Sequence, residues 1–500
     1  MKILNVMNFV RQCEPRDAET EKKLFSTTAS QLAMVKEQDI DNTFLLQYDA
    51  LCDPRYVELF RNEINEKTEL GLWYEIVQEL TDAVGIPYES ELGWKWDWHI
   101  KPGFSMAYSL SDREKLIDEA MRKFKEVFGY YPKTVGSWIM DTHTINYLTD
   151  NYDISMMCNC RDQVNTDAYT LIGGYFNQAY FPSRKNMHTP AQSAELTVKT
   201  PMFRLLGPDP IHNYDWYKYL SKNCEKKTPC FTMEAVWSGK YPEVNDWYYK
   251  TFYENENMGF SYAQIGQENS FAMYDLVNPI KMQIEKAKAL KDVRIMKMRD
   301  TGEAFKKKYG AETPVTSVCA MDNWDSEDVQ SIYYDCKNYT ANLFRHNKKV
   351  FIRALYLFDE NAEDYYNGKC CTTFDAVYEN QPVVDTVIWD DGESECGMYL
   401  DLDGAQLKTE RLSEKALKVS WGDKYVIFYE NKTEIKNCDV AFYKGNAKAD
   451  ITPSADRIGY CYRGRKYEVF ASVGEIVQEN DCIKILSENG NICLEYSVQK

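Results

Sequence analysis

Over residues 1–275 the chain alternates short apolar runs with longer segments in which apolar residues recur at helical spacing. Residues with helix-capping chemistry, Asp17 and Asp53, open two of these longer segments, and Gly85 and Gly129 close two others. Strands separated by helices favour a parallel sheet, and about seven such units favour a (β/α)7-type parallel barrel. The apolar runs predict seven strands: "ILNVMNFV", "NTFLLQYDA", "LGLWY", "TVGSWIM", "ISMMCNC", "CFTMEAVW" and "GFSYAQI".

The pattern changes along the chain. Three long aromatic segments, 86–110, 161–229 and 237–258, interrupt the alternation, and we expect them to be functional loops. Residues 275–325 are basic and have helical spacing, so they predict a helical extension. Beyond about residue 330, short alternating runs separated by Gly, Asn and Asp turns predict an antiparallel β sandwich. The fold expected is therefore α/β, with a barrel over residues 1–330 and a β-sandwich domain over 331–500.

Composition narrows the classes of partner. The chain has 44% hydrophobic and 27% charged residues, typical of an ordered globular protein. Its formal net charge of −18 argues against nucleic acid and anionic membrane, because both require a basic surface. Aromatic residues make up 14% of the chain, and carbohydrate sites use such rings for stacking, as do large cores.

The N-terminal segment and the cysteines indicate in which cellular compartment the protein is expected. "MKILNVMNFVRQCEPR" favours a first strand over a secretory signal, and no apolar stretch approaches the roughly 20 residues of a membrane span. The 15 cysteines are scattered, which favours reduced thiols and a cytoplasmic protein. A mature secreted protein whose signal has been removed would look the same. For the oligomeric state, both a monomer and a homo-oligomer are compatible with the sequence.

Polar residues follow each predicted strand, and in a parallel barrel these positions converge on one open face. Carboxylic acids, amides and aromatic rings gathered there suit glycoside hydrolysis, in which two carboxylates flank the scissile bond. We take Asp141, Glu268 and Glu234 as the catalytic candidates. Residues expected to bind the substrate are Gln47, Glu75, Trp96, His99, Trp138, His143, Arg161, Asp162 and Gln267.

Each candidate also has a structural interpretation. Asp141 in "GSWIMDTHTI" can cap the helix that follows it, and Glu268 can cap the next one. Arg161 and Asp162 can form an ion pair, and a structural role is the better interpretation of His143. The alternate tryptophans of "WKWDWHI" (94–100) would share one face of a strand, where they could form a sugar platform or pack against the barrel.

The sequence predicts neither a metal nor another cofactor. Metal-dependent sugar deacetylases need two histidines four residues apart, and none of the five histidines has that spacing. Neither a G-x-S-x-G elbow nor a phosphate-binding glycine motif is present.

Residues 111–154, with "FGYYPKTVGSW", a carboxylate after the strand and "YLTDNYDIS", resemble the polysaccharide-deacetylase-like superfamily. That superfamily has a (β/α)7 barrel and includes glycoside hydrolase families 57 and 38. The arrangement of the whole chain, a barrel followed by a β sandwich, resembles that of a bacterial group described as family-57-like. The resemblance implies Asp141 as nucleophile and Glu268 as general acid. Two features depart from it: family 57 usually has Glu first and Asp second, and the H-x-D motif of family 38 is absent from "NVMNFVR".

Together these features predict a metal-independent carbohydrate-active hydrolase, a retaining enzyme acting on α-linked glycosides. A divergent sugar deacetylase and a catalytically inactive carbohydrate-binding barrel are the alternatives.

Overall fold

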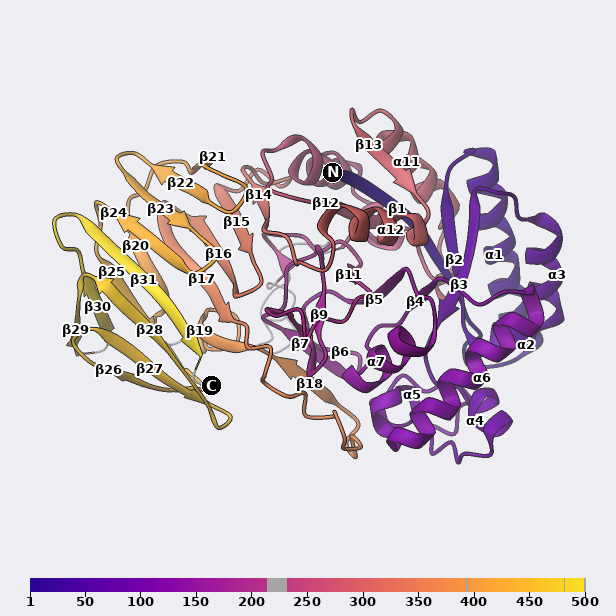
Figure 1. The fold of residues 1–500 in the computed structure, drawn as a ribbon. Coiled ribbons are helices and arrows are strands. Elements are labelled where there is room, and N and C mark those ends of the chain that lie inside the picture. The colour runs from indigo at the N-terminus through magenta and orange to yellow at the C-terminus, as the bar shows by residue number, and fades with distance from the viewer. Residues whose placement is uncertain (214–231, 393, 481, 499–500) are drawn as a thin grey trace.

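The structure is a computed structural model that describes residues 1–213, 232–392, 394–480 and 482–498. It consists of a curled, mostly parallel sheet surrounded by helices and, beside it, a region of antiparallel strands (Figure 1). The expected fold class, a (β/α)7-type parallel barrel followed by an antiparallel β sandwich, is confirmed. Seven parallel strands form the main path of the curled sheet: β1 (Lys2–Val10), β2 (Asn42–Leu46), β3 (Thr68–Trp73), β4 (Thr134–Gly136), β5 (Met156–Cys160), β11 (Met202–Leu205) and β12 (Ser261–Ile265).

The strand order is β12-β1-β2-β3-β4-β5-β11. Within the described residues the sheet stays open, because β11 pairs on its outer side with the antiparallel β8 (Ala179–Tyr180). The sixth parallel strand along the chain is β11, not the expected segment "CFTMEAVW". "CFTMEAVW" supplies only one bridge, Glu234 to Gly266, before a helix begins at Ala235, and its first two residues lie outside the described residues.

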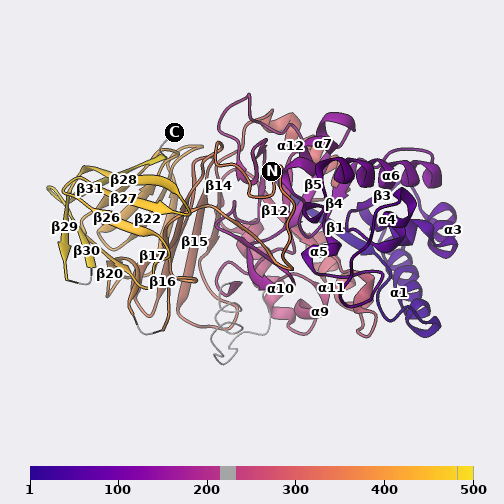
Figure 2. The same ribbon diagram turned by 90° about the horizontal axis from the view of Figure 1, so that it is seen from below.

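Helices cover the outer face of the sheet, as Figure 2 shows from below. Asp17 and Asp53 cap α1 and α3 as expected, and Gly129 ends α6 in the left-handed conformation. Ser109 caps α6, with its side chain accepting from the Asp112 backbone. The helices are α1 (Ala18–Glu37), α2 (Tyr48–Cys52), α3 (Pro54–Glu63), α4 (Gln78–Val84), α5 (Ile100–Gly103), η1 (Ser105–Ala107), α6 (Leu110–Phe128), α7 (Thr142–Asn151), α9 (Ala235–Ser238), α10 (Pro242–Tyr249), η2 (Lys250–Glu254), η3 (Asn269–Phe271), α11 (Val277–Lys288) and α12 (Met298–Tyr309).

Two expected segments are more regular than their sequences suggested. The segment 237–258 forms α10 and the π-helical turn η2. The basic extension contains a strand, β13 (Val293–Met296), which adds in parallel to the first half of β1. Short strands also lie in the segment after β5: β6 (Gln163–Thr166), β7 (Tyr169–Ile172), β9 (Pro182–Ser183) and β10 (Asn186–Pro190).

The C-terminal region consists of two antiparallel sheets that share one hydrophobic core. The first strand, β14, precedes residue 331, where composition places the start of the sandwich; the domain division itself stays a prediction. One sheet holds β14 (Thr316–Ala320), β15 (Val329–Asp335), β16 (Tyr339–His346), β17 (Lys349–Leu357), β19 (Gln381–Asp385), β20 (Cys396–Asp401), β25 (Val440–Lys444), β29 (Glu475–Glu479) and β30 (Cys482–Leu486). The other holds β21 (Lys408–Arg411), β22 (Leu417–Trp421), β23 (Lys424–Phe428), β24 (Lys432–Lys436), β26 (Asp450–Pro453), β27 (Arg457–Tyr462), β28 (Arg465–Val473) and β31 (Asn491–Val498).

The two halves of the chain are joined by close packing. Phe176 stacks on Tyr333 of β15 with ring centroids 3.7 Å apart. In addition, β18 (Ala376–Glu379) pairs in parallel with β7, so a C-terminal strand completes a small sheet of the barrel region (Figure 1). Because both faces of β15 and β16 are covered, almost every residue in these strands is buried.

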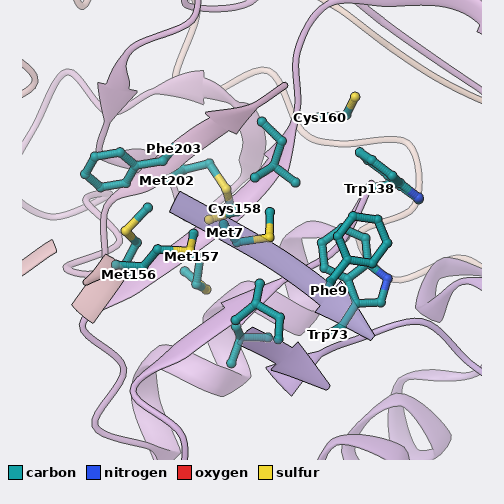
Figure 3. Packing of buried hydrophobic residues seen from close by; sticks show 14 of the residues in the cluster. Met7, Phe9, Trp73, Trp138, Met156, Met157, Cys158, Cys160, Met202 and Phe203 are labelled. Atoms are coloured by element: carbon teal, nitrogen blue, oxygen red, sulfur yellow. The ribbon is translucent and has the colours of Figure 1, made fainter. Parts of the chain in front are cut away.

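The interior of the curled sheet is filled by large apolar side chains from several strands. Figure 3 shows Met7, Met157 and Met202 on one side and the rings of Phe9, Trp73 and Trp138 on the other. Phe9 stacks on Trp73 at 3.9 Å, and Trp138 meets both rings edge-on. The barrel is therefore packed solid below its open end, so a ligand can enter only above this layer.

Candidate functional site

The carboxyl ends of the parallel strands open into a cavity of about 310 Å³. Several residues around it follow a parallel strand within three positions, as Arg11 follows β1 and Glu268 follows β12. Convergence of several strand ends is the usual place for chemistry in this class of fold. The lining residues are Arg11, Glu75, Trp96, Trp98, Phe104, Trp138, Arg161, Gln163, Asp167, Tyr169, Leu206, Thr232, Glu234, Trp237, Glu268 and Phe271.

Arg11 joins two glutamates of the cavity. Its Nη2 lies 2.5 Å from Oε2 of Glu268, and its Nη1 lies 3.2 Å from Oε2 of Glu75. The guanidinium also lies over the ring of Trp96, 4.1 Å from its centroid. The Arg11 backbone exchanges two 3.0 Å hydrogen bonds with the Asn269 side chain, which fixes the end of β1 against the segment after β12.

Glu75 is held through one oxygen. Its Oε2 accepts hydrogen bonds from Nη1 of Arg11, Nε2 of Gln47 and Nε1 of Trp96 at 3.0–3.2 Å. Its Oε1 is buried, and the Trp73 side chain also hydrogen-bonds to this carboxyl. Burial raises the pKa of Glu75, and the positive charge of Arg11 opposes that rise. Glu75 is therefore a fixed part of the cavity wall, held by donors on its Oε2.

Glu268 and Glu234 are the two other glutamates at the cavity. Burial raises the pKa of Glu268 to about 7, with Arg11 opposing the rise and the charge of Glu234 adding to it. Burial also raises the pKa of Glu234, against the effect of hydrogen bonds from Gln267 and Thr232 and of the charge of Arg161. Two interacting carboxyls with raised pKa values are typical of general acid–base sites.

Local backbone geometry places these two acids. Gly266, with φ of 125°, ends β12 so close to the backbone of Met7 that a Cβ would lie 1.8 Å from the Met7 carbonyl oxygen. Its bridge to Glu234 then brings the Glu234 and Gln267 side chains together, with Nε2 of Gln267 3.0 Å from Oε1 of Glu234. Gln267 itself is not among the lining residues, so it positions Glu234 from behind.

Aromatic side chains form much of the cavity wall. "WKWDWHI" is a loop rather than a strand, and its tryptophans separate: Trp96 and Trp98 line the cavity, whereas Trp94 is 39% exposed and does not. Trp138 lines the cavity above the layer of Phe9 and Trp73 (Figure 3). His99 is not a lining residue; it stacks on Trp98 at 3.9 Å and its Nδ1 lies 2.7 Å from Asp97.

Arg161 and Asp162, adjacent in sequence, have different surroundings. Arg161 lines the cavity, and its Nη1 donates hydrogen bonds to Oδ1 of Asn213 and to the carbonyl oxygen of Asp162. The Asp162 carboxylate points elsewhere, 2.6 Å from Nη2 of Arg204, and accepts a hydrogen bond from the Gly174 backbone. Asp162 therefore pairs with Arg204 rather than with Arg161.

Asp141 does not lie at the cavity. It is fully buried, caps α7 by accepting from the Thr144 backbone, and lies 2.7 Å from Nη1 of Arg113. Its other oxygen accepts hydrogen bonds from the Ser105 and Thr144 hydroxyls. The expectation that Asp141 faces Glu268 across the barrel mouth is not met, because β4 ends at Gly136 and four further residues precede Asp141.

His143 and Gln47 also lie outside the cavity lining. His143 is on α7, with its Nε2 3.0 Å from the half-exposed Glu114. Gln47 precedes α2, is fully buried, and reaches the site only through its hydrogen bond to Glu75.

Ten lining residues were not among the sequence candidates for the site: Arg11, Trp98, Phe104, Gln163, Asp167, Tyr169, Leu206, Thr232, Trp237 and Phe271. Position after β1 was a usable signal for Arg11, and Trp98 belongs to the "WKWDWHI" pattern. Tyr169 comes from β7, inside a segment expected to be a loop, so strand counting could not have found it.

No group of three or more His, Cys, Asp and Glu side chains within the described ranges is arranged to hold a metal ion. None of the helices in those ranges has the length and apolar character needed to cross a bilayer.

Comparison with solved structures adds to this geometry. The chain is similar to a protein from Parabacteroides distasonis described as a "putative glycoside hydrolase/deacetylase", with 12% identity, 76% of this chain and 89% of that chain covered, and a TM-score of 0.55. Lower scores are found for a 4-alpha-glucanotransferase from Thermococcus litoralis (8% identity, 100% and 98% covered, TM-score 0.34) and a "probable Polysaccharide deacetylase" from Pseudomonas aeruginosa (12%, 61% and 91%, 0.37). No family model and no curated protein matches the sequence. The first likeness shows a shared fold.

Proposed function

We propose that the protein is a carbohydrate-active hydrolase that cleaves glycosides in the cavity, with Glu268 as general acid and Glu234 as the second carboxylate. The observation that carries this proposal is the meeting of Glu75, Glu234 and Glu268 in one cavity whose walls are largely aromatic. Glu234 takes the role that the resemblance assigned to Asp141. The same resemblance supports α-linked substrates and a retaining outcome.

The pKa of about 7 suits Glu268 to donate a proton near neutral pH. In the first step Glu268 protonates the glycosidic oxygen while a carboxylate oxygen of Glu234 bonds to the anomeric carbon, and the aglycone leaves as an alcohol. In the second step water attacks that carbon, its proton passes to the Glu268 carboxylate, and the bond to Glu234 breaks. Arg161 supports the first step because its charge favours the ionised form of Glu234.

Other residues would orient the sugar. Glu75 borders the space for the sugar, and three donors keep its carboxylate fixed there. Trp96, Trp98 and Trp138 offer rings on which the C–H faces of a pyranose can pack.

The test uses glycosyl fluorides of glucose, mannose and galactose in both anomeric forms, with NMR to follow the configuration of the product. We expect hydrolysis of an α-fluoride with retention, strongly reduced in Glu234→Gln and Glu268→Gln. The matched control, Glu243→Gln, changes an exposed glutamate away from the cavity lining and should keep full activity.

Two results would redirect the proposal. Release of acetate from acetylated oligosaccharides without glycosidic cleavage would support the deacetylase alternative. Sugar binding in the cavity without any turnover would support an inactive carbohydrate-binding barrel.

A further inference from the structure

The segments that carry Glu234 and Glu268 each continue into a short helical turn with an aromatic residue three positions on. Trp237 in α9 follows Glu234, and its backbone nitrogen donates to the Glu234 carbonyl oxygen at 3.0 Å. Phe271 in η3 follows Glu268, which precedes that turn. Both aromatic residues line the cavity, so the two acids and the two rings border the same space.

The aromatic surface continues outward beyond the cavity. A turn closed by a hydrogen bond from the Tyr274 backbone to the Phe271 carbonyl oxygen brings Tyr274 beside Phe271, with ring centroids 6.2 Å apart. Lys240 connects the two turns, because its Nζ lies 5.8 Å from the Trp237 centroid and 5.3 Å from that of Tyr274. We call these four residues, Trp237, Lys240, Phe271 and Tyr274, the lip.

The lip is exposed where it leaves the cavity. Tyr274 is 46% exposed and the adjacent Met273 is 73% exposed, although both are large apolar side chains. The cavity itself, at about 310 Å³, is at the lower end of the roughly 300–1,000 Å³ of ligand pockets. A saccharide longer than the cavity must therefore extend over its rim, and the lip supplies rings and an ammonium group beside both acids.

We propose that the lip binds the sugar unit next to the one held in the cavity, so that the substrate is an oligosaccharide rather than a simple monosaccharide glycoside. Tyr274 and Phe271 pack against the C–H face of that unit, and Lys240 donates hydrogen bonds to its hydroxyls. The inference rests on the proposed function for the nature of the ligand in the cavity.

The experiment compares a glycosyl fluoride, which has no second sugar, with a trisaccharide of the same sugar and linkage. In Tyr274→Ala we expect kcat/KM for the trisaccharide to fall about tenfold, while kcat/KM for the fluoride stays unchanged. Tyr274→Phe keeps the ring and should restore most of the trisaccharide activity. The control Tyr131→Ala removes a tyrosine of similar exposure, 41%, just before β4 and thus at the opposite end of the strands.

An equal loss on both substrates, or no loss on the trisaccharide, would overturn the lip as a sugar site while leaving the hydrolase proposal intact. If no substrate is turned over, trisaccharide binding measured by calorimetry decides. Weaker binding in Tyr274→Ala with unchanged binding in Tyr131→Ala would support the lip even though the hydrolase proposal had failed. Unchanged or absent trisaccharide binding would overturn it.

Discussion

Arg11 and Glu268 form a buried ion pair, with Nη2 of the arginine 2.5 Å from Oε2 of the glutamate, and the same guanidinium holds Glu75. The single guanidinium group of Arg11 thus contacts the carboxyl groups of both Glu268 and Glu75. Burial raises the pKa of both carboxyls, and the charge of Arg11 opposes that rise in each.

Replacing Glu268 with Gln should lower kcat by about 10²–10⁴-fold, because Gln cannot donate the proton. In the wild type, kcat/KM should fall as pH rises through about 7, where the protonated form of Glu268 is lost. Initial rates measured from pH 5 to 9 test this, and a wild-type rate that rises across pH 7 would contradict the role of Glu268 as general acid.

Arg11→Gln should move the alkaline fall in kcat/KM to higher pH, since the charge of Arg11 lowers the pKa of Glu268. Arg16→Gln is the control: Arg16 pairs with Asp49 and Glu79 and does not line the cavity, so its pH profile should match the wild type. Melting curves should accompany both profiles. An unshifted profile in folded Arg11→Gln would show that Arg11 does not tune the acid.

Glu268 should also make stability depend on pH. Its folded pKa, about 7, exceeds that of an unfolded glutamate, about 4.3, so the folded state binds more protons between these values. Its contribution to the free energy of unfolding is therefore full below about pH 4.3 and is lost as pH rises to 7. Between pH 5 and 7.5, the melting temperature of Glu268→Gln should fall less than that of the wild type, by a few degrees.

Asp141→Asn should act on stability more than on catalysis. Asn keeps the cap of α7, but the buried Arg113 loses its carboxylate, which typically costs about 3–5 kcal/mol. We expect a clear loss of unfolding free energy in urea and nearly unchanged kcat per folded molecule. Asp150→Asn, which breaks an exposed pair with Arg184, should cost at most about 1 kcal/mol. A stable Asp141→Asn protein without activity would instead show that Asp141 takes part in the reaction.

Chelation with EDTA should leave the melting temperature and any glycosidase activity unchanged, given the absence of a ligand cluster in the ranges that the structure describes. A large fall in melting temperature that zinc reverses would favour the deacetylase alternative.

The sequence predicts the curled sheet well where strands are mainly apolar, as in β1 and β12. It misses β11 because Arg204 lies inside that strand, where the buried Asp162 and the carbonyl oxygens of Cys160 and Tyr175 satisfy its guanidinium. The expected sixth strand fails for the opposite reason, since "CFTMEAVW" is apolar enough for a strand but turns into α9 immediately after Glu234.

The positions of the strand ends also explain which candidate residues reach the cavity. Glu75 and Glu268 reach the cavity because each follows the end of its strand by two or three residues. "TVGSWIM" looked like one strand to residue 140, which would have put Asp141 at the mouth as well. The strand β4 ends at Gly136. The residues after it make irregular hydrogen bonds to the adjacent strand β5, as the Met140 backbone nitrogen does to the Asn159 side chain. Strand length, which sets where a side chain emerges, is decided by tertiary contacts that the sequence pattern does not contain.

The parallel pairing of β18 with β7 has a consequence for how this protein can be divided. Removing everything after residue 330 would remove the partner strand Ala376–Glu379 and leave one edge of the buried β7 without hydrogen bonds, while its other edge still pairs with β6. A bare edge of this kind attracts the edges of other chains, so the shortened protein should form inclusion bodies rather than a working barrel. The N-terminal half is therefore not a portable module, and chimaeras that exchange the C-terminal half must carry residues 360–380 of the native chain with the barrel.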